Sequence, residues 1–232
     1  ALPIFLLAVS VIVCVLAFNH NGKSTTVRYV FNGNRLISDG ELEALILPEF
    51  AGGIGNLSIS KIKESLESHP FIKKAVVYRK SPEIIHAEVK EIKPEAVVSD
   101  EHGKLFFLCE NYIVREYRNF PCHEDLILIR GALTEDRIKR KSIDGALKII
   151  SGLKEPAFEH LYPVISEIIY NEKTDFSLLT QSGNTCIRLG SSDDIKNKLI
   201  KLDKYIEGRL KDKNFALSKT ADLRWKGCIV LN

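Results

Sequence analysis

The sequence predicts an α+β fold in three parts: a membrane segment, a small two-layer domain and a larger sheet-rich domain. Three observations predict it. The first eighteen residues carry no charge, residues 27–94 show strand, helix, helix, strand and strand patterns, and from residue 95 onward strand patterns dominate. With 232 residues, of which 45% are hydrophobic and 27% charged, the chain is long enough for one large domain or two small ones.

The apolar run of residues 1–18 predicts a single-pass signal anchor in the inner (cytoplasmic) membrane, followed by a linker at 19–26. As a helix the run would reach about 27 Å, close to the hydrocarbon thickness of a bilayer. A cleaved signal peptide is the alternative, but the run exceeds the usual apolar core of roughly 7 to 15 residues. A lipoprotein anchor at Cys14 would need a small residue just before the cysteine, and Val13 is too large. We expect the N-terminus, with a missing cytoplasmic segment, in the cytoplasm and the bulk of the chain in the periplasm.

Charge and cysteine content exclude several classes of function. The 33 basic and 30 acidic residues leave a net charge of +3, which gives no case for a nucleic-acid partner. Neither the cysteines nor the histidines have the spacing of a zinc site, so we expect no metal and no cofactor. Four cysteines lie outside the membrane segment: Cys109, Cys122, Cys186 and Cys228. They could form disulfides in three ways, of which a Cys109–Cys122 pair would be tested first, or they could remain small buried thiols.

Residues 27–94 predict a compact βααββ domain. Residues 27–31 place Val27, Tyr29 and Phe31 on one face of an extended segment, which indicates the first strand. Ser38 and Glu41 form a capping box, which predicts a short helix that begins after Ser38. A second helix follows at about 60–68, with apolar residues four positions apart.

We expect Ser60 to cap this second helix and His69-Pro70 to end it. Ser58 and Lys61 also match the Ser-x-x-Lys pattern of penicillin-binding enzymes. The partner motifs Ser-Asp-Asn and Lys-Thr-Gly are absent, so a catalytic role is disfavoured. Two strands, IKKAVVYRK and EIIHAEVKEI, follow and are joined by a Ser-Pro turn.

Residues 95–232 predict a mixed β domain with helices on one face. A hairpin turns near Gly103, and a buried strand, LILIRG, follows. Thr134 is expected to cap a long amphipathic helix that ends at about Gly152. Three more strands precede a helix capped by residues 192–194, whose lysines, among them Lys201, are expected to face water.

The last stretch, ALSKTADLRWKGCIVLN, predicts two strands around a turn or bulge at Gly227. Residues 221–226 alternate between apolar and charged, so Trp225 is expected on the buried side of a strand. A sheet that finishes at such a strand leaves an edge to which another chain can add itself. The alternative is a sheet edge that binds no partner, because the charge of Lys226 disfavours pairing with another strand. The candidate partner-binding residues are Arg224, Trp225, Gly227, Cys228, Ile229 and Val230.

Both halves resemble one bacterial family. The run NLSISKIKESLESHPFIKKAVVYRKSPEIIHAEVKEIKPEAVV resembles the POTRA domain of the FtsQ/DivIB cell-division family. In the second half, the Gly103 hairpin, the Leu189-Gly190 step and the closing Asp-Leu-Arg-Trp with Gly227 resemble that family's β domain. Trp225 departs from the tyrosine or phenylalanine that is usual there.

The resemblance implies a non-enzymatic divisome scaffold at the division septum. In the family this end of the β domain binds the single-pass division proteins FtsB and FtsL outside the cytoplasm, and the protein helps control septal peptidoglycan synthesis. It implies no cofactor, no small-molecule substrate and no nucleic acid. The alternative from another class is a POTRA-containing envelope transport or assembly protein, although only one such unit is visible. An enzyme of cell-wall metabolism is a third hypothesis.

Overall fold

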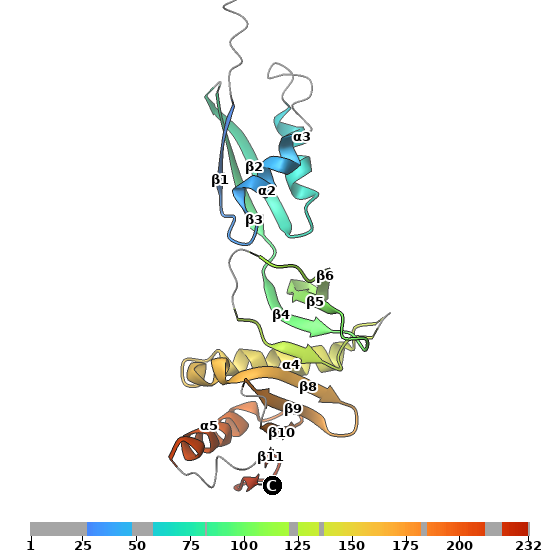
Figure 1. Ribbon diagram of the computed structural model, residues 1–232, viewed down its shortest axis with the longest axis vertical. Helices are drawn as coiled ribbons and strands as arrows, with labels where there is room; N and C mark the ends of the chain where they lie inside the picture. The colour runs from blue at the N-terminus through green and yellow to red at the C-terminus, as the bar shows by residue number, and fades with distance from the viewer. Residues whose placement is uncertain are drawn as a thin grey trace, which may run out of the picture. The chain divides into compact units, whose positions relative to one another are not determined.

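The computed structural model forms two compact units, unit 1 up to Glu91 and unit 2 from Ile92 (Figure 1). It describes residues 27–47, 58–81, 83–120, 125–134, 137–181, 185–211 and 220–231. The predicted membrane segment and linker lie outside these residues. In the part of the chain that is described, no helix is both long and apolar enough to cross a bilayer.

Unit 1 has the predicted βααββ order. Its elements are β1 (Arg28–Asn32), α2 (Asp39–Ile46), α3 (Ile59–Glu67), β2 (Ile72–Ser81) and β3 (Ile84–Glu91). The sheet order is β1-β3-β2, with β1 parallel and β2 antiparallel to the central β3. Both helices cover one face of this sheet, and the other face carries no described element (Figure 1).

The two helices of unit 1 begin at serine caps. The Ser38 hydroxyl accepts a hydrogen bond from the backbone N–H of Glu41 at 3.3 Å, as the capping box predicts. The cap of α3 is Ser58, whose hydroxyl accepts from the N–H of Lys61 at 3.5 Å, so the prediction of Ser60 was wrong. Ser60 lies inside the first turn of α3.

Glu91 closes unit 1 by holding the loop between β1 and α2. Its carboxylate accepts hydrogen bonds from three successive backbone N–H groups at 2.9 to 3.0 Å, those of Arg35, Leu36 and Ile37. A carboxylate that receives several N–H groups satisfies donors that the loop would otherwise leave unpaired.

Unit 2 is built on a nine-stranded mixed sheet. Its strands are β4 (Pro94–Ser99), β5 (Leu105–Cys109), β6 (Ile113–Glu116), β7 (Leu128–Arg130), β8 (Ile165–Asn171), β9 (Asp175–Thr180), β10 (Cys186–Gly190), β11 (Thr220–Asp222) and β12 (Val230–Leu231). The order is β12-β11-β10-β9-β8-β7-β4-β5-β6. The predicted domain boundary at residue 94 is the first residue of β4. Antiparallel blocks on either side are joined by β7, which pairs in parallel with both β4 and β8.

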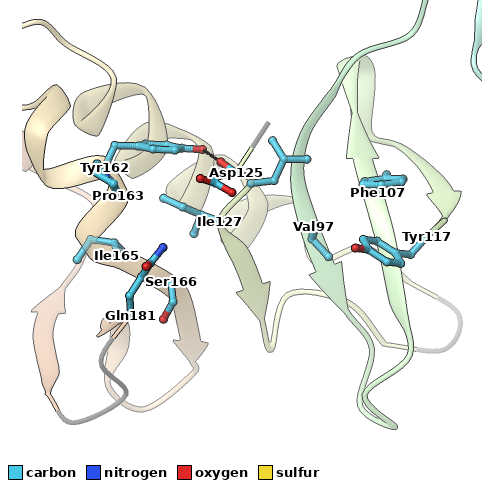
Figure 2. A pocket seen from close by; sticks show the side chains of 11 residues that line it. Val97, Phe107, Tyr117, Asp125, Ile127, Tyr162, Pro163, Ile165, Ser166 and Gln181 are labelled. Carbon is cyan, nitrogen blue, oxygen red and sulfur yellow. Dashed lines mark hydrogen bonds between the residues drawn. The ribbon is translucent and has the colours of Figure 1, made fainter. Parts of the chain in front are cut away.

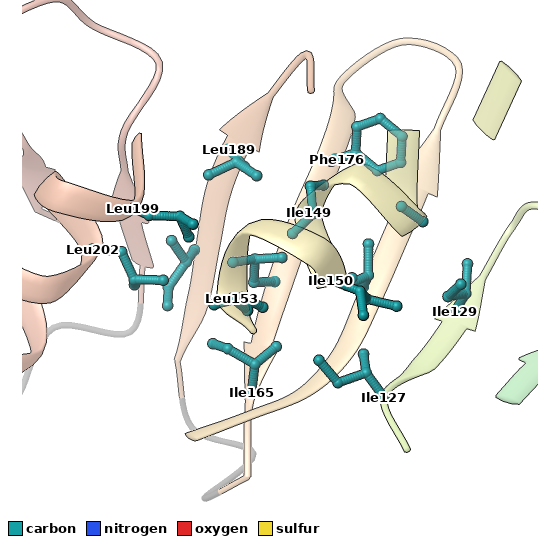
Figure 3. Packing of buried hydrophobic residues seen from close by; sticks show 14 of the residues in the cluster. Ile127, Ile129, Ile149, Ile150, Leu153, Ile165, Phe176, Leu189, Leu199 and Leu202 are labelled. Atoms are coloured by element: carbon teal, nitrogen blue, oxygen red, sulfur yellow. The ribbon is translucent and has the colours of Figure 1, made fainter. Parts of the chain in front are cut away.

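Two helices, α4 (Arg140–Leu153) and α5 (Ile195–Lys211), share one hydrophobic core with the sheet. Leu153 of α4 lies toward Leu199 and Leu202 of α5, and Ile150 of α4 lies on the side of Ile127, all within one cluster over the strands (Figure 3). Gly152 allows the close approach, because a Cβ there would lie 3.0 Å from the Cδ1 of Leu199. The apolar stripes predicted for both helices therefore face this core.

The helix predicted to be capped by Thr134 begins at Arg140, with Lys139 at the N-cap position, so this prediction was wrong. Thr134 belongs to a turn instead, since its N–H and its hydroxyl both donate to the carbonyl of Arg137, at 3.0 and 3.2 Å. An isolated bridge between Leu133 and Ile138 closes this turn. Threonine hydroxyls satisfy turns as readily as helix ends, which is why the cap signal misled.

Candidate partner-binding edge

Strand β12 is the outermost strand of the unit 2 sheet. It pairs only with β11, through Ala221 opposite Leu231 and Asp222 opposite Val230. No described strand lies on its other side, so its outward backbone groups are available to pair. Ile229 and Leu231 pack against the core, whereas Val230 is 40% exposed.

The first of the two strands predicted for this segment, alternating over residues 221–226, ends earlier than expected. Strand β11 ends at Asp222, whose carboxylate accepts the backbone N–H of Arg224 at 3.1 Å. This side-chain bond two residues ahead turns the chain. Trp225 therefore leaves the strand and is 58% exposed, a correction of the buried position expected for it. Gly227 has a φ of +78°, consistent with the predicted turn.

Arg224 and Asp222 form a bidentate ion pair beside this turn. The Nη2 of Arg224 lies 2.6 Å from Oδ2 of Asp222, and its Nε lies 2.9 Å from Oδ1. The Arg224 hydrogen bonds hold the pKa of the Asp222 carboxyl below its ordinary value, and Arg188 adds a smaller effect in the same direction. The stem of Arg224 runs over Gly190, where a Cβ would lie 3.0 Å from its Cγ. Glycine in the Leu-Gly step thus leaves room for this arginine.

Lys201 of α5 anchors the same segment from the helix side. Its Nζ donates to the carbonyl of Leu223 at 2.5 Å and to that of Trp225 at 2.8 Å. The prediction that Lys201 faces water was wrong. The sequence offered one signal, because Lys201 lies one turn before Tyr205, which is fully buried, and therefore borders the apolar stripe.

Removing the charge of Asp222 should destabilise unit 2 in a pH-dependent way. Because its folded pKa is lowered, the ionised carboxylate contributes stability above its unfolded pKa of roughly 3.9, and the contribution is lost as the pH falls through the folded value. Asp222→Asn should cost about 1–2 kcal/mol at pH 7, since the Arg224 side chain is 41% exposed and partly screened. Thermal unfolding at pH 7 and pH 3 measures this. A gap from wild type that stays equal at pH 3, or a matching loss in the exposed-site control Asp193→Asn, would contradict it.

A cavity of about 390 Å³ opens in unit 2 beside β7 (Figure 2). Two of its hydroxyls are engaged within the fold: that of Tyr162 donates to the carbonyl of Asp125 at 3.0 Å, and that of Ser166 donates to the carbonyl of Leu179 at 3.1 Å. No histidine or cysteine lines the cavity. Within the described ranges, no three His, Cys, Asp or Glu side chains converge as metal ligands.

A histidine of unit 1 and the cysteines are the other candidate reactive side chains. His69, which follows α3, is buried: its Nε2 lies 3.2 Å from Oε1 of Glu41, and its Nδ1 accepts a hydrogen bond from the backbone N–H of Phe71. Burial raises the pKa of the Cys109 thiol to about 11. Cys109, Cys186 and Cys228 are free thiols, and Cys122 lies outside the described residues.

Comparison with known proteins gives matches to family models in both units. A model described as the FtsQ-type POTRA domain matches residues 28–91. A model described as FtsQ/DivIB, C-terminal related, matches residues 107–231, more than half of the chain and inclusive of β12. Among curated proteins, no sequence matches the chain.

Proposed function

The chain belongs to the FtsQ/DivIB family, whose domains are those of a cell-division scaffold, and on that premise we propose that it captures FtsB-like and FtsL-like proteins at β12. The partner's strand pairs with the free edge and extends the sheet. The observation that carries this proposal is that β12 is the edge strand of the sheet, paired with β11 on one side and with no described strand on the other.

Side chains around β12 support a specific site rather than a bare edge. Trp225 and Val230 are the exposed large apolar residues of this segment, and exposed aromatic residues are frequent binding hot spots. Lys201 and the Asp222–Arg224 pair fix the backbone from both sides, so the partner meets a preorganised surface. Backbone pairing supplies affinity, and the Trp225 ring serves as an aromatic anchor that adds to it.

We further propose that this capture takes place outside the cytoplasm, at the division septum. Residues 1–18 would anchor the chain in the inner membrane, and both units would lie in the periplasm. Holding two small single-pass partners there would let the protein help control septal peptidoglycan synthesis without chemistry of its own.

Loss of the Trp225 side chain should weaken partner capture about 30-fold, the effect of a hot-spot residue worth about 2 kcal/mol. Removal of residues 227–232 should abolish capture, because the edge strand itself is lost. Calorimetric titration of residues 27–232 with a soluble FtsB-like segment measures both effects, and a pull-down from a membrane extract identifies the bands.

The matched control is Ile200→Ala, an exposed apolar residue on α5. It should bind as wild type does. Trp225→Ala with unchanged affinity and an unchanged unfolding curve would refute capture at this edge. If the bands recovered belong to outer-envelope assembly rather than to division, the scaffold assignment fails and the transport alternative replaces it.

A further inference from the structure

The second face of the unit 1 sheet is open to solvent. Helices α2 and α3 cover the opposite face, and the strands present an alternating set of side chains here (Figure 1). Cross-strand register places them as neighbours. The set comprises Arg28, Val30 and Asn32 of β1, Lys74, Val76, Tyr78 and Lys80 of β2, and Ile84, His86, Glu88 and Lys90 of β3.

The centre of this open face is apolar and aromatic. Val30, His86 and Tyr78 form one row across the three strands. The Tyr78 ring stacks on His86 with centroids 5.4 Å apart. Tyr78 is 42% exposed and Val76, its neighbour along β2, is 46% exposed, so the row presents contact area rather than a core.

Cations surround this centre. Arg28, Lys74, Lys80 and Lys90 are all exposed, and none forms an ion pair with a described residue. Glu88 is the carboxylate among the face's strand residues, and it accepts a hydrogen bond from the Tyr78 hydroxyl at 3.3 Å. Lys74 lies directly opposite Lys90, a like-charge pair that destabilises a sheet. An anionic partner would relieve this repulsion.

We propose that this open face binds the anionic surface of a lipid bilayer. Lysine and arginine side chains reach toward lipid phosphates while their stems cover apolar surface, and tyrosine is enriched at the membrane interface. The predicted linker of residues 19–26 spans no more than roughly 30 Å when extended, which would hold unit 1 near the bilayer. This membrane contact goes beyond the proposed function. It relies on only one part of that function, the proposed membrane anchor at residues 1–18.

A flat surface is favoured over a strand partner at this place. On β2, the edge strand of the sheet, the N–H of Ala75 already donates to the carboxylate of Glu67 at 2.9 Å. Strand addition along that edge would have to displace this bond. The exposed cations and apolar groups lie instead on the face, where a planar anionic surface contacts all of them together.

The test uses residues 27–232, which contain every buried hydrophobic residue in the described part of both units. Co-sedimentation compares vesicles of phosphatidylcholine alone with vesicles that also contain phosphatidylglycerol. Wild type should bind only the anionic vesicles, and more weakly as salt is raised. The triple variant Lys74→Gln, Lys80→Gln, Lys90→Gln should lose about fivefold affinity per lysine, hence about 100-fold in all.

The control with the same charge change is Lys173→Gln, Lys196→Gln, Lys204→Gln, at exposed lysines of unit 2. It should stay within about twofold of wild type. Equal loss in the control, no binding by wild type, or binding of polyglutamate in place of vesicles would each overturn the proposal, the last in favour of an acidic protein. The unit 2 triple should also leave the unit 1 unfolding curve unchanged, and the unit 1 triple should leave capture at β12 intact, so failure here is separate from failure of the proposed function.

Discussion

Gly131→Ala should lower the free energy of unfolding of unit 2 by about 3–4 kcal/mol. Gly131 follows β7 with a φ of +80°, a conformation that alanine adopts only at a cost. A Cβ there would also collide with the backbone carbonyl oxygen of Tyr170 in β8, and a backbone atom cannot swing aside as a side chain does. The strand pair must therefore separate to accept the methyl group.

Gly103→Ala is the matched control for this effect. Gly103 has a φ of +82° as well, but its Cβ would meet nothing within 4 Å. It should lose only about 1 kcal/mol, the cost of the backbone conformation alone. Urea unfolding of residues 27–232 followed by circular dichroism gives both values, with the unit 1 transition as an internal reference. Equal losses in the two variants would show that the collision with Tyr170 contributes nothing.

Lys201→Met should destabilise the segment from β11 to β12 by about 2–3 kcal/mol. Methionine keeps the length of the side chain but removes the charged donor, which leaves the carbonyls of Leu223 and Trp225 without their partner. Hydrogen bonds from a charged group are worth roughly 1.5–3 kcal/mol each, and the one to Trp225 counts less because it is exposed. Partner capture should also weaken, because the edge strand β12 is then held less firmly in position.

Amide hydrogen exchange measures this locally, as faster exchange at residues 220–231 in the variant. Lys201→Arg should restore part of the protection, because a charged donor is present again. Lys204→Met, on the exposed side of the same helix, should exchange as wild type does. Faster exchange spread evenly over unit 2 would mean that Lys201 stabilises the whole fold and does not position the edge.

The sequence predicted most elements, and its errors have local physical causes. The same cap rule was right at Ser38 and wrong at Thr134. At Ser38 the chain continues into the helix α2, whereas at Thr134 the threonine bonds satisfy a turn closed by the Leu133–Ile138 bridge. Hydroxyl residues serve both structures, so a cap signal alone does not fix where a helix begins.

The sequence predicted where along the chain the candidate site lies, but it did not predict how the side chains of that segment are arranged. Alternation suggested that Trp225 was buried, but the side chain of Asp222 bonds the N–H of Arg224 and ends the strand early. The acceptors of Lys201 could not be assigned, because they are backbone carbonyls, which carry no residue identity. The closeness of Arg224 to Gly190 depends on the parallel pairing of β10 with β11, a non-local contact that periodicity does not encode.

The short strand β7 has a consequence for the order of folding. The meanders β4-β5-β6 and β8-β9-β10 close through short connections, so each is expected to form early. The two meanders can join only when the three residues of β7 pair in parallel with both β4 and β8, which lie far from β7 along the chain. Until then each meander has a bare inner edge, so a nascent chain is most exposed to wrong pairing in this interval. Chaperone dependence would accordingly arise at the middle of the sheet, where β7 joins the two meanders.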